Sequence, residues 1–201
     1  NNVIKDGFLG VFKQSTVSVD HDLLAAGLSL YRNKDVIACI LGTGSNSVYF
    51  DGKNLSEVVP ALGYILGDEG SGSFFGKRIL ADFLYKRLPS ELQKEVEKLG
   101  LTKDEIFKKV YMESNANVFL ASMSPILIKN KHLQYCQQLI QEGFELFIDR
   151  HVLCFPNYHQ VEVSFVGSIS ALLADELEAI CNEKGLSVGQ IIRRPIDALV
   201  D

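Results

Sequence analysis

The order of apolar and polar residues predicts two strands joined by a short polar loop. The apolar run 36–41 leads into Gly42-Thr43-Gly44-Ser45-Asn46, and a second run, residues 47–50, leaves that loop. Asp51-Gly52 then marks a turn. Runs of this length, rich in β-branched and aromatic residues and bounded by small polar residues, are typical of a β-hairpin. We therefore expect a hairpin whose loop is the sequence Gly-Thr-Gly-Ser-Asn.

The rest of the chain alternates between strand-like and helix-like stretches. Strands show alternation of apolar and polar positions, whereas helices show apolar residues three and four apart. The predicted strands are 16–19, 161–166 and 188–193, and the predicted helices are 1–10, 23–31, 74–85, 132–151 and 171–180. Strands and helices in this order indicate an α/β layer fold.

Residues 89–131 differ from their surroundings, because they predict several short, charged helices. Pro89-Ser90 begins one helix, and Thr102 followed by Glu105 is typical of a capping box that begins the next. Further short helices are expected at 115–122 and after Ser124. We interpret this segment as a helical insertion into the layer fold.

Two further glycine-rich turns stand at the ends of predicted elements. Residues 63–72 contain four glycines and two acids and precede a helix, and Gly167-Ser168-Ile169-Ser170 follows a strand. Glycine allows positive φ and close approach to backbone N–H groups, and a helix N-terminus attracts anions. These turns, like the hairpin loop, are suited to an oxygen-rich ligand such as a phosphate, although the hairpin loop alone also fits a plain turn.

Three carboxylates are candidates for chemistry. Asp68 and Glu69 are adjacent in the second turn, where they could face sugar hydroxyls, a hydrated metal or simply solvent. Asp22 lies between a predicted strand and a helix, and the local sequence favours a helix N-cap for Asp22 or Asp20.

Composition narrows the range of functions. The chain has 201 residues, a net charge of −5 and scattered Lys and Arg, so a nucleic-acid surface is not expected. No apolar run approaches the ~18 residues of a membrane span, no signal peptide is visible, and we expect a cytoplasmic protein. The four cysteines are far apart, which indicates reduced thiols and not a metal site.

Together the motifs resemble those of the N-acetylglucosamine kinases and the related BadF/BadG-type ATPases. The resemblance depends on Gly-Thr-Gly-Ser-Asn at 42–46, followed by Gly-Tyr-Ile-Leu-Gly-Asp-Glu-Gly-Ser-Gly at 63–72, with Asp22-Leu23-Leu24-Ala25-Ala26 ahead of both. It implies the ribonuclease H-like domain shared by actin and hexokinase, with a mixed sheet and flanking helices. It also implies ATP and Mg²⁺ as cofactors, and a small amino sugar as substrate.

Roles follow from the resemblance position by position. Asp22 would be the general base that accepts the proton of the sugar 6-hydroxyl. The phosphates and nucleotide of ATP would contact Gly42, Thr43, Gly44, Ser45, Gly167 and Ser168, and the sugar would contact Asn46, Gly63, Asp68 and Glu69.

The chain departs from the family pattern in two places. Ala61-Leu62-Gly63 stands where such kinases carry Gly-Trp-Gly, so the identity of the sugar stays open. The first phosphate loop of the family is not found before Asp22. We therefore expect the chain to hold a C-terminal kinase domain (1–88 and 132–201, with the insertion at 89–131), to lack an N-terminal half-domain, and to be inactive alone.

Two alternatives remain at this stage. An ATPase activator of a radical dehydratase or reductase would use cysteines to share an iron–sulfur cluster across a dimer, but no cysteine lies in the glycine-rich turns. A sugar- or nucleotide-binding regulator without activity could use the same fold. The oligomeric state also stays open, with a homodimer as one alternative.

Overall fold

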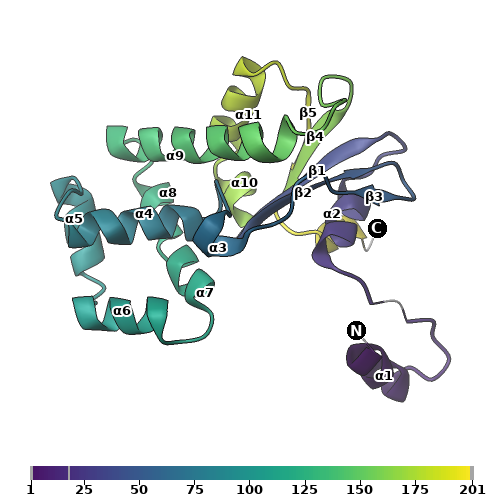
Figure 1. Ribbon diagram of the computed structural model, residues 1–201, viewed down its shortest axis with the longest axis horizontal. Coiled ribbons are helices and arrows are strands. Elements are labelled where there is room, and N and C mark those ends of the chain that lie inside the picture. The colour runs from purple at the N-terminus through teal and green to yellow at the C-terminus, as the bar shows by residue number, and fades with distance from the viewer. Residues whose placement is uncertain (1, 18, 200–201) are drawn as a thin grey trace.

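The sheet at the centre of the molecule has five strands and mixed directions (Figure 1). A computed structural model describes residues 2–17 and 19–199. The strand order is β3-β2-β1-β4-β5, where β1 pairs antiparallel with β2 and parallel with β4. The strands are β1 (Val36–Leu41), β2 (Ser45–Phe50), β3 (Leu55–Ser56), β4 (Glu162–Val166) and β5 (Val188–Ile192). The predicted hairpin and the α/β class are thus confirmed.

Helices surround this sheet and extend from it to one side (Figure 1). They are α1 (Asn2–Val11), α2 (Asp22–Leu30), α3 (Gly63–Leu66), α4 (Gly72–Leu84), α5 (Ser90–Glu97), α6 (Lys103–Tyr111), α7 (Ala116–Ala121), α8 (Ser124–Lys129), α9 (Gln134–Phe147), the π-helix η1 (Ile148–Val152), α10 (Ser168–Leu172), α11 (Ala174–Glu183) and α12 (Ile196–Leu199). Among these helices, none combines the length and apolar character needed to cross a membrane.

Side chains of the central strand alternate between two buried clusters. Ile37, Cys39 and Leu41 of β1 belong to the larger cluster, which also holds the apolar faces of α4, α9 and α11. Val36 and Ala38 point to the opposite face, where α2 packs. Burial on both faces explains why β1 reads as a continuous apolar run.

The helices of residues 89–131 share the larger cluster with the sheet. Leu92, Ile106 and Leu127 come from this segment and are buried in the same cluster as Cys39 of β1. The predicted capping box is present, because Thr102 accepts from the Glu105 N–H and Glu105 accepts from the Thr102 N–H.

Glycine allows α4 to lie close to two neighbouring helices. A Cβ on Gly76 would lie only 1.7 Å from the Leu120 carbonyl oxygen of α7. On the α9 side, a Cβ on Gly143 would lie 2.6 Å from the Phe75 ring. Larger side chains at either position would force the helices apart.

Three predictions of local structure were wrong or incomplete. None of Thr16, Val17 and Val19 belongs to a strand, and Ser18 lies outside the described residues. Alternation alone does not make a strand, because a strand also needs a neighbour in a sheet. The helix predicted at 171–180 begins at Ser168 and is interrupted at Leu173, and that predicted at 132–151 is α-helical only to Phe147.

The close contact at Gly76 gives a stability prediction. Gly76→Ala should lower the free energy of unfolding by about 1–3 kcal/mol or more, because the new methyl group meets backbone and not a flexible side chain. Gly7→Ala is the matched control, since a Cβ there has nothing within 4 Å. Urea unfolding followed by circular dichroism would measure both. Equal stability of the two variants would contradict this account of the α4–α7 contact.

Candidate functional site

The three glycine-rich turns meet at one end of the sheet, where β1 and β4 finish. Strands β1 and β4 are parallel neighbours, with Ile40 opposite Val166, so Gly42 and Gly167 leave the sheet side by side. Gly167 has φ +140°, and a Cβ there would lie 2.1 Å from the Leu41 carbonyl oxygen. Only glycine fits this approach. Ligands of α/β sheets commonly bind outside the carboxyl ends of parallel strands.

The hairpin loop is tighter than the sequence indicated. The Gly42 N–H donates to the Gly44 carbonyl at 3.0 Å, and the loop consists of Gly42, Thr43 and Gly44. Ser45 and Asn46 already belong to β2. The Asn46 side-chain oxygen accepts from the Ser47 N–H at 2.8 Å.

Backbone hydrogen bonds join the hairpin loop to the second turn. The N–H groups of Gly72 and Ser73 donate to the carbonyls of Gly42 (2.8 Å) and Thr43 (3.0 Å). The next N–H, of Phe74, donates to Ser71 Oγ, which caps α4. The expectation that the start of α4 offers its N–H groups to an anion is therefore wrong, because the protein itself uses those three.

The hairpin loop offers the donors instead. Within residues 2–17 and 19–199, the N–H groups of Thr43 and Gly44 form no hydrogen bond. In the same described part of the chain, the buried Ser45 Oγ also has no partner. Unpaired donors at a glycine-flanked loop suit an oxyanion, because no described protein group accepts from them and a ligand oxygen can do so.

Asp68 lies directly against this loop. Its backbone has φ +56°, and its carboxylate accepts from the Ser45 N–H (Oδ1, 3.3 Å) and from Ser73 Oγ (Oδ2, 3.4 Å). A Cβ on Gly44 would lie 2.9 Å from Asp68 Oδ2. Burial raises the pKa of Asp68, and the hydrogen bonds from Ser45 and Ser73 oppose this. Asp68 thus contacts the predicted phosphate loop.

Glu69 points elsewhere and is the more deeply buried of the two acids. Its side chain is only 5% exposed and pairs with Arg150 through Oε1. Its Oε2 lies 3.5 Å from His151 Nε2. His151 stacks on Phe147, and its backbone carbonyl accepts from Ser47 Oγ of β2 at 2.6 Å.

Sequence reasoning missed Arg150 and His151. Both lie in η1, whose π-helical turn follows α9 directly and sets their direction. Short π-helical turns often occur at functional sites. Arg150 is 81 positions from Glu69 in the sequence, so no local pattern predicts that the two side chains pair.

Each of the other predicted residues stands at the start of a helix. Gly63, with φ +69°, begins α3, and Ser168 is exposed at the start of α10. Asp22 is exposed at the first position of α2, and His21 holds the cap position. The prediction that Asp22 or Asp20 caps the helix was therefore wrong.

Helix α2 packs on the same sheet. Its C-cap residue Tyr31 packs on Phe50, which pairs with Val36 at the start of β1. Phe50 is the last residue of β2, so Tyr31 lies at the end of the hairpin opposite to its loop.

In the described ranges, no three His, Cys, Asp or Glu side chains gather to hold a metal ion. The cysteines are free, as predicted, and Cys39, Cys136 and Cys181 are buried. Mg²⁺ commonly binds through one or two carboxylates together with substrate phosphates, and Asp68 beside the loop fits that arrangement.

The buried imidazole predicts a pH dependence of stability. Burial lowers the pKa of His151 below its ordinary 6.5, and the charge of Glu69 opposes this shift. The unfolded state therefore binds a proton more readily, so stability falls as pH drops through about 6.5, by at most about 1.4 kcal/mol per pH unit. Urea unfolding between pH 7.5 and 5.5 should give a steeper loss for the wild type than for His151→Gln.

The exposed His132 supplies the control for that measurement. His132→Gln should keep the wild-type dependence. Identical slopes for the wild type and His151→Gln would mean that His151 is not held neutral by the fold.

Comparison with known proteins supports the kinship suggested by the motifs. No protein-family profile matches the sequence, and no curated protein gives a significant match. Among solved structures, a "Putative N-acetylglucosamine Kinase" from Porphyromonas gingivalis aligns with a TM-score of 0.92 and 32% identity, over 98% of this chain and 70% of that chain. A second protein so described, from Chromobacterium violaceum, has a TM-score of 0.69 and 17% identity over 95% of this chain and 69% of that chain, which supports the fold alone.

The Porphyromonas alignment is close enough to decide kinship. It covers 98% of this chain at 32% identity. The chain therefore belongs to the family of N-acetylglucosamine kinases.

Proposed function

We propose that this chain is part of an ATP-dependent kinase that phosphorylates an amino sugar, with N-acetylglucosamine as the first candidate and its 6-phosphate as the product. The fold is proposed to be the ribonuclease H-like domain of actin and hexokinase. The observation that carries the proposal is the hairpin loop, where the N–H groups of Thr43 and Gly44 and the buried Ser45 Oγ are unpaired among the described residues.

The phosphates of ATP are proposed to bind at this loop. Backbone N–H groups stabilise charge on phosphate oxygens without reorganisation, because the fold holds them in place beforehand. The bonds from Gly72 and Ser73 to the loop carbonyls fix the direction in which the free N–H groups point. Gly167 and Ser168, at the end of the neighbouring strand, are proposed to contact the nucleotide.

Asp68 is proposed to hold Mg²⁺ beside the phosphates. The Asp68 carboxylate lies directly beside the loop, because a Cβ on Gly44 would be 2.9 Å from Asp68 Oδ2. A carboxylate next to a phosphate repels it unless a cation lies between them. When bound, the metal would neutralise phosphate charge. The sequence had assigned Asp68 to the sugar, and that role stays a prediction.

The sugar is proposed to lie between the loop and Asp22. Asn46, Gly63 and Glu69 would contribute to its site, with Glu69 held by Arg150 and His151. Asp22 would accept the proton of the sugar hydroxyl as that oxygen attacks the γ-phosphoryl group of ATP. Its exposed position at the start of α2 leaves it accessible to a substrate.

A second lobe is proposed to complete the site. The Porphyromonas protein extends beyond the aligned part, since the alignment covers 70% of its length. In kinases of the resembled family, ATP and sugar bind between two halves. The sequence 1–201 would then form one side of the cleft and, by itself, transfer phosphate slowly or not at all.

An assay of ADP release over a panel of sugars tests the proposal. The protein to assay is this chain fused to the unaligned part of the Porphyromonas protein, in the order found there, with the 201-residue chain alone as control. Release that requires N-acetylglucosamine or a related amino sugar is expected of the fusion. ADP release that does not depend on a sugar would instead favour an ATPase activator. Nucleotide binding without ADP release would favour a non-catalytic regulator.

Gly42→Ala separates ligand contact from folding. A Cβ on Gly42 has nothing within 4 Å, so the variant should keep its thermal stability. A methyl group beside the phosphates should weaken MgATP binding about tenfold or more, equivalent to about 1.4 kcal/mol. Isothermal titration would measure both proteins, with Gly10→Ala as a glycine control far from the loop. Unchanged affinity of Gly42→Ala would remove Gly42 from the phosphate site.

Asp22→Asn tests the base. Loss of general-base catalysis should lower turnover of the fusion by about 10²–10⁴-fold, while MgATP affinity and thermal stability stay as in the wild type. Asp20→Asn is the matched control two residues away. If Asp20→Asn and not Asp22→Asn abolished turnover, the base would have been assigned to the wrong carboxylate.

A further inference from the structure

The end of β5 places an arginine beside the third glycine-rich turn. Ile40 of β1, Val166 of β4 and Ile192 of β5 are partners in one row across the sheet. The Gly167 N–H donates to the Ile192 carbonyl at 3.0 Å, which joins the turn to the end of β5. Arg193 is the next residue. It therefore leaves the sheet beside Gly167, at the end of the sheet that carries the hairpin loop.

Arg193 carries a charge that the described fold does not use. Its side chain is exposed and has no hydrogen bond, ion pair or ring contact with the described residues. The neighbouring Arg194 is engaged, because it donates to Asp197 through Nε (3.0 Å) and Nη2 (2.7 Å). These three residues line a hollow of about 360 Å³, a volume in the range of small-ligand pockets. The guanidinium of Arg193 is thus available to a ligand in this hollow.

The separation of β1 from β5 matches the extent of a nucleotide. β4 lies between β1 and β5 in the sheet. Neighbouring strands are about 4.8 Å apart, so the ends of β1 and β5 are separated by about 10 Å. This is comparable with the separation of the phosphates from the base in an extended nucleotide. A nucleotide with its phosphates at residues 42–44 and its ribose at Gly167 therefore brings its base to Arg193.

We propose that Arg193 stacks its guanidinium on the face of the adenine of ATP and so holds the base of the phosphoryl donor. A guanidinium is planar and weakly hydrated, which favours stacking on an aromatic ring, and its charge adds a cation–π attraction. This inference rests on the proposed function, because it requires the phosphates of ATP at the hairpin loop. It adds a base-binding residue that none of the glycine-rich motifs contains.

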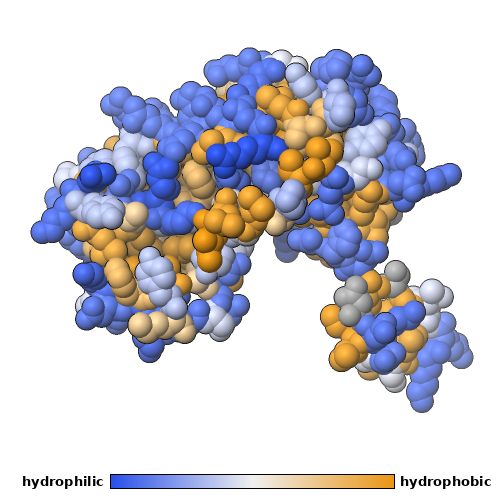
Figure 2. Space-filling view, viewed as in Figure 1, coloured by the Kyte–Doolittle hydropathy of each residue, from blue (hydrophilic) through white to orange (hydrophobic). Residues whose placement is uncertain are grey.

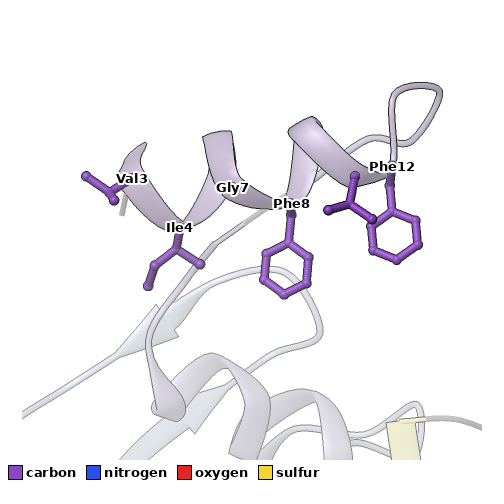
Figure 3. Close-up of a pocket in the computed structure, with 6 residues that line it drawn as sticks. Val3, Ile4, Gly7, Phe8 and Phe12 are labelled. Atoms are coloured by element: carbon purple, nitrogen blue, oxygen red, sulfur yellow. The ribbon is translucent and has the colours of Figure 1, made fainter.

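Helix α1 presents a different kind of exposed surface and supplies a control. Val3, Ile4 and Phe8 are each more than half exposed. Ile4, Phe8 and Phe12 project from one side of the helix (Figure 3), and the helix shows a hydrophobic surface in Figure 2 and stands away from the sheet in Figure 1. Lys5 is exposed outside this apolar stripe. Lys5→Ala therefore removes one positive charge at a distance from the proposed base site.

Isothermal titration of the 201-residue chain with MgADP tests the proposal. Arg193→Ala should weaken binding about tenfold, the loss expected for one stacked base. Its melting temperature should stay as in the wild type, because the side chain has no contact to lose. Arg193→Lys keeps the charge but not the planar group, so its affinity should lie closer to that of Arg193→Ala than to that of the wild type. Lys5→Ala should bind MgADP as the wild type does.

A nuclear magnetic resonance signal separates stacking from an ion pair with phosphate. On addition of MgADP, the Arg193 Nε–H resonance should move upfield, because the group lies over the face of an aromatic ring. A downfield shift, as for a hydrogen bond to a phosphate oxygen, would overturn the proposal. Wild-type affinity of either Arg193→Ala or Arg193→Lys would overturn it as well.

The same titrations distinguish a failure of this inference from a failure of the proposed function. If the amides of Thr43 and Gly44 respond to MgADP while Arg193→Ala binds as the wild type does, the phosphate site is supported and the base site is wrong. If the wild-type chain does not bind MgADP, both the phosphate site and the base site are wrong.

Discussion

Two backbone hydrogen bonds determine how the candidate site is built. The N–H groups of Gly72 and Ser73 donate to the carbonyls of Gly42 and Thr43, and so join the start of α4 to the hairpin loop. With the loop carbonyls used in this way, the free N–H groups of Thr43 and Gly44 are held in a fixed direction. The tight packing of α4 on α7 and α9 through Gly76 and Gly143 keeps this helix start in place. The candidate phosphate site therefore depends on how α4 packs against α7 and α9.

The adjacent acids Asp68 and Glu69 show how neighbours in sequence acquire separate environments. The left-handed backbone at Asp68 turns the chain, so that Asp68 faces the loop while Glu69 faces η1. A left-handed conformation at a residue other than glycine carries strain, and such strain often accompanies function. Glu69 is paired and almost fully buried, whereas Asp68 is the acid in contact with the loop. This difference favours Asp68 as the one that meets phosphate and metal.

The sequence predicted much of the local structure but not the contacts between distant parts of the chain. The hairpin at 36–50, the helix predicted at 74–85 and the capping box at Thr102 follow from alternation, cap residues and glycine placement, which are local properties. The pairing of Glu69 with Arg150 and His151 could not be foreseen, since it depends on where α9 ends. The strand predicted at 16–19 failed for a related reason, because strand formation requires a sheet that no local pattern can supply. The candidate residues at 42–46 and 63–72 were predicted from their motifs. The hydrogen bonds from the N–H groups at the start of α4 to the loop carbonyls could be seen only in the folded structure.

The most direct measurement of the central claim is a nuclear magnetic resonance titration of the ¹⁵N-labelled chain with MgADP. If nucleotide phosphates bind at the hairpin loop, the amide resonances of Thr43 and Gly44 should shift the most, because they gain hydrogen bonds that the described fold does not supply. The amides of Gly72 and Ser73, already bonded to the loop, should shift much less. Saturable binding in which Thr43 and Gly44 do not move would contradict the account and place the nucleotide elsewhere on the fold.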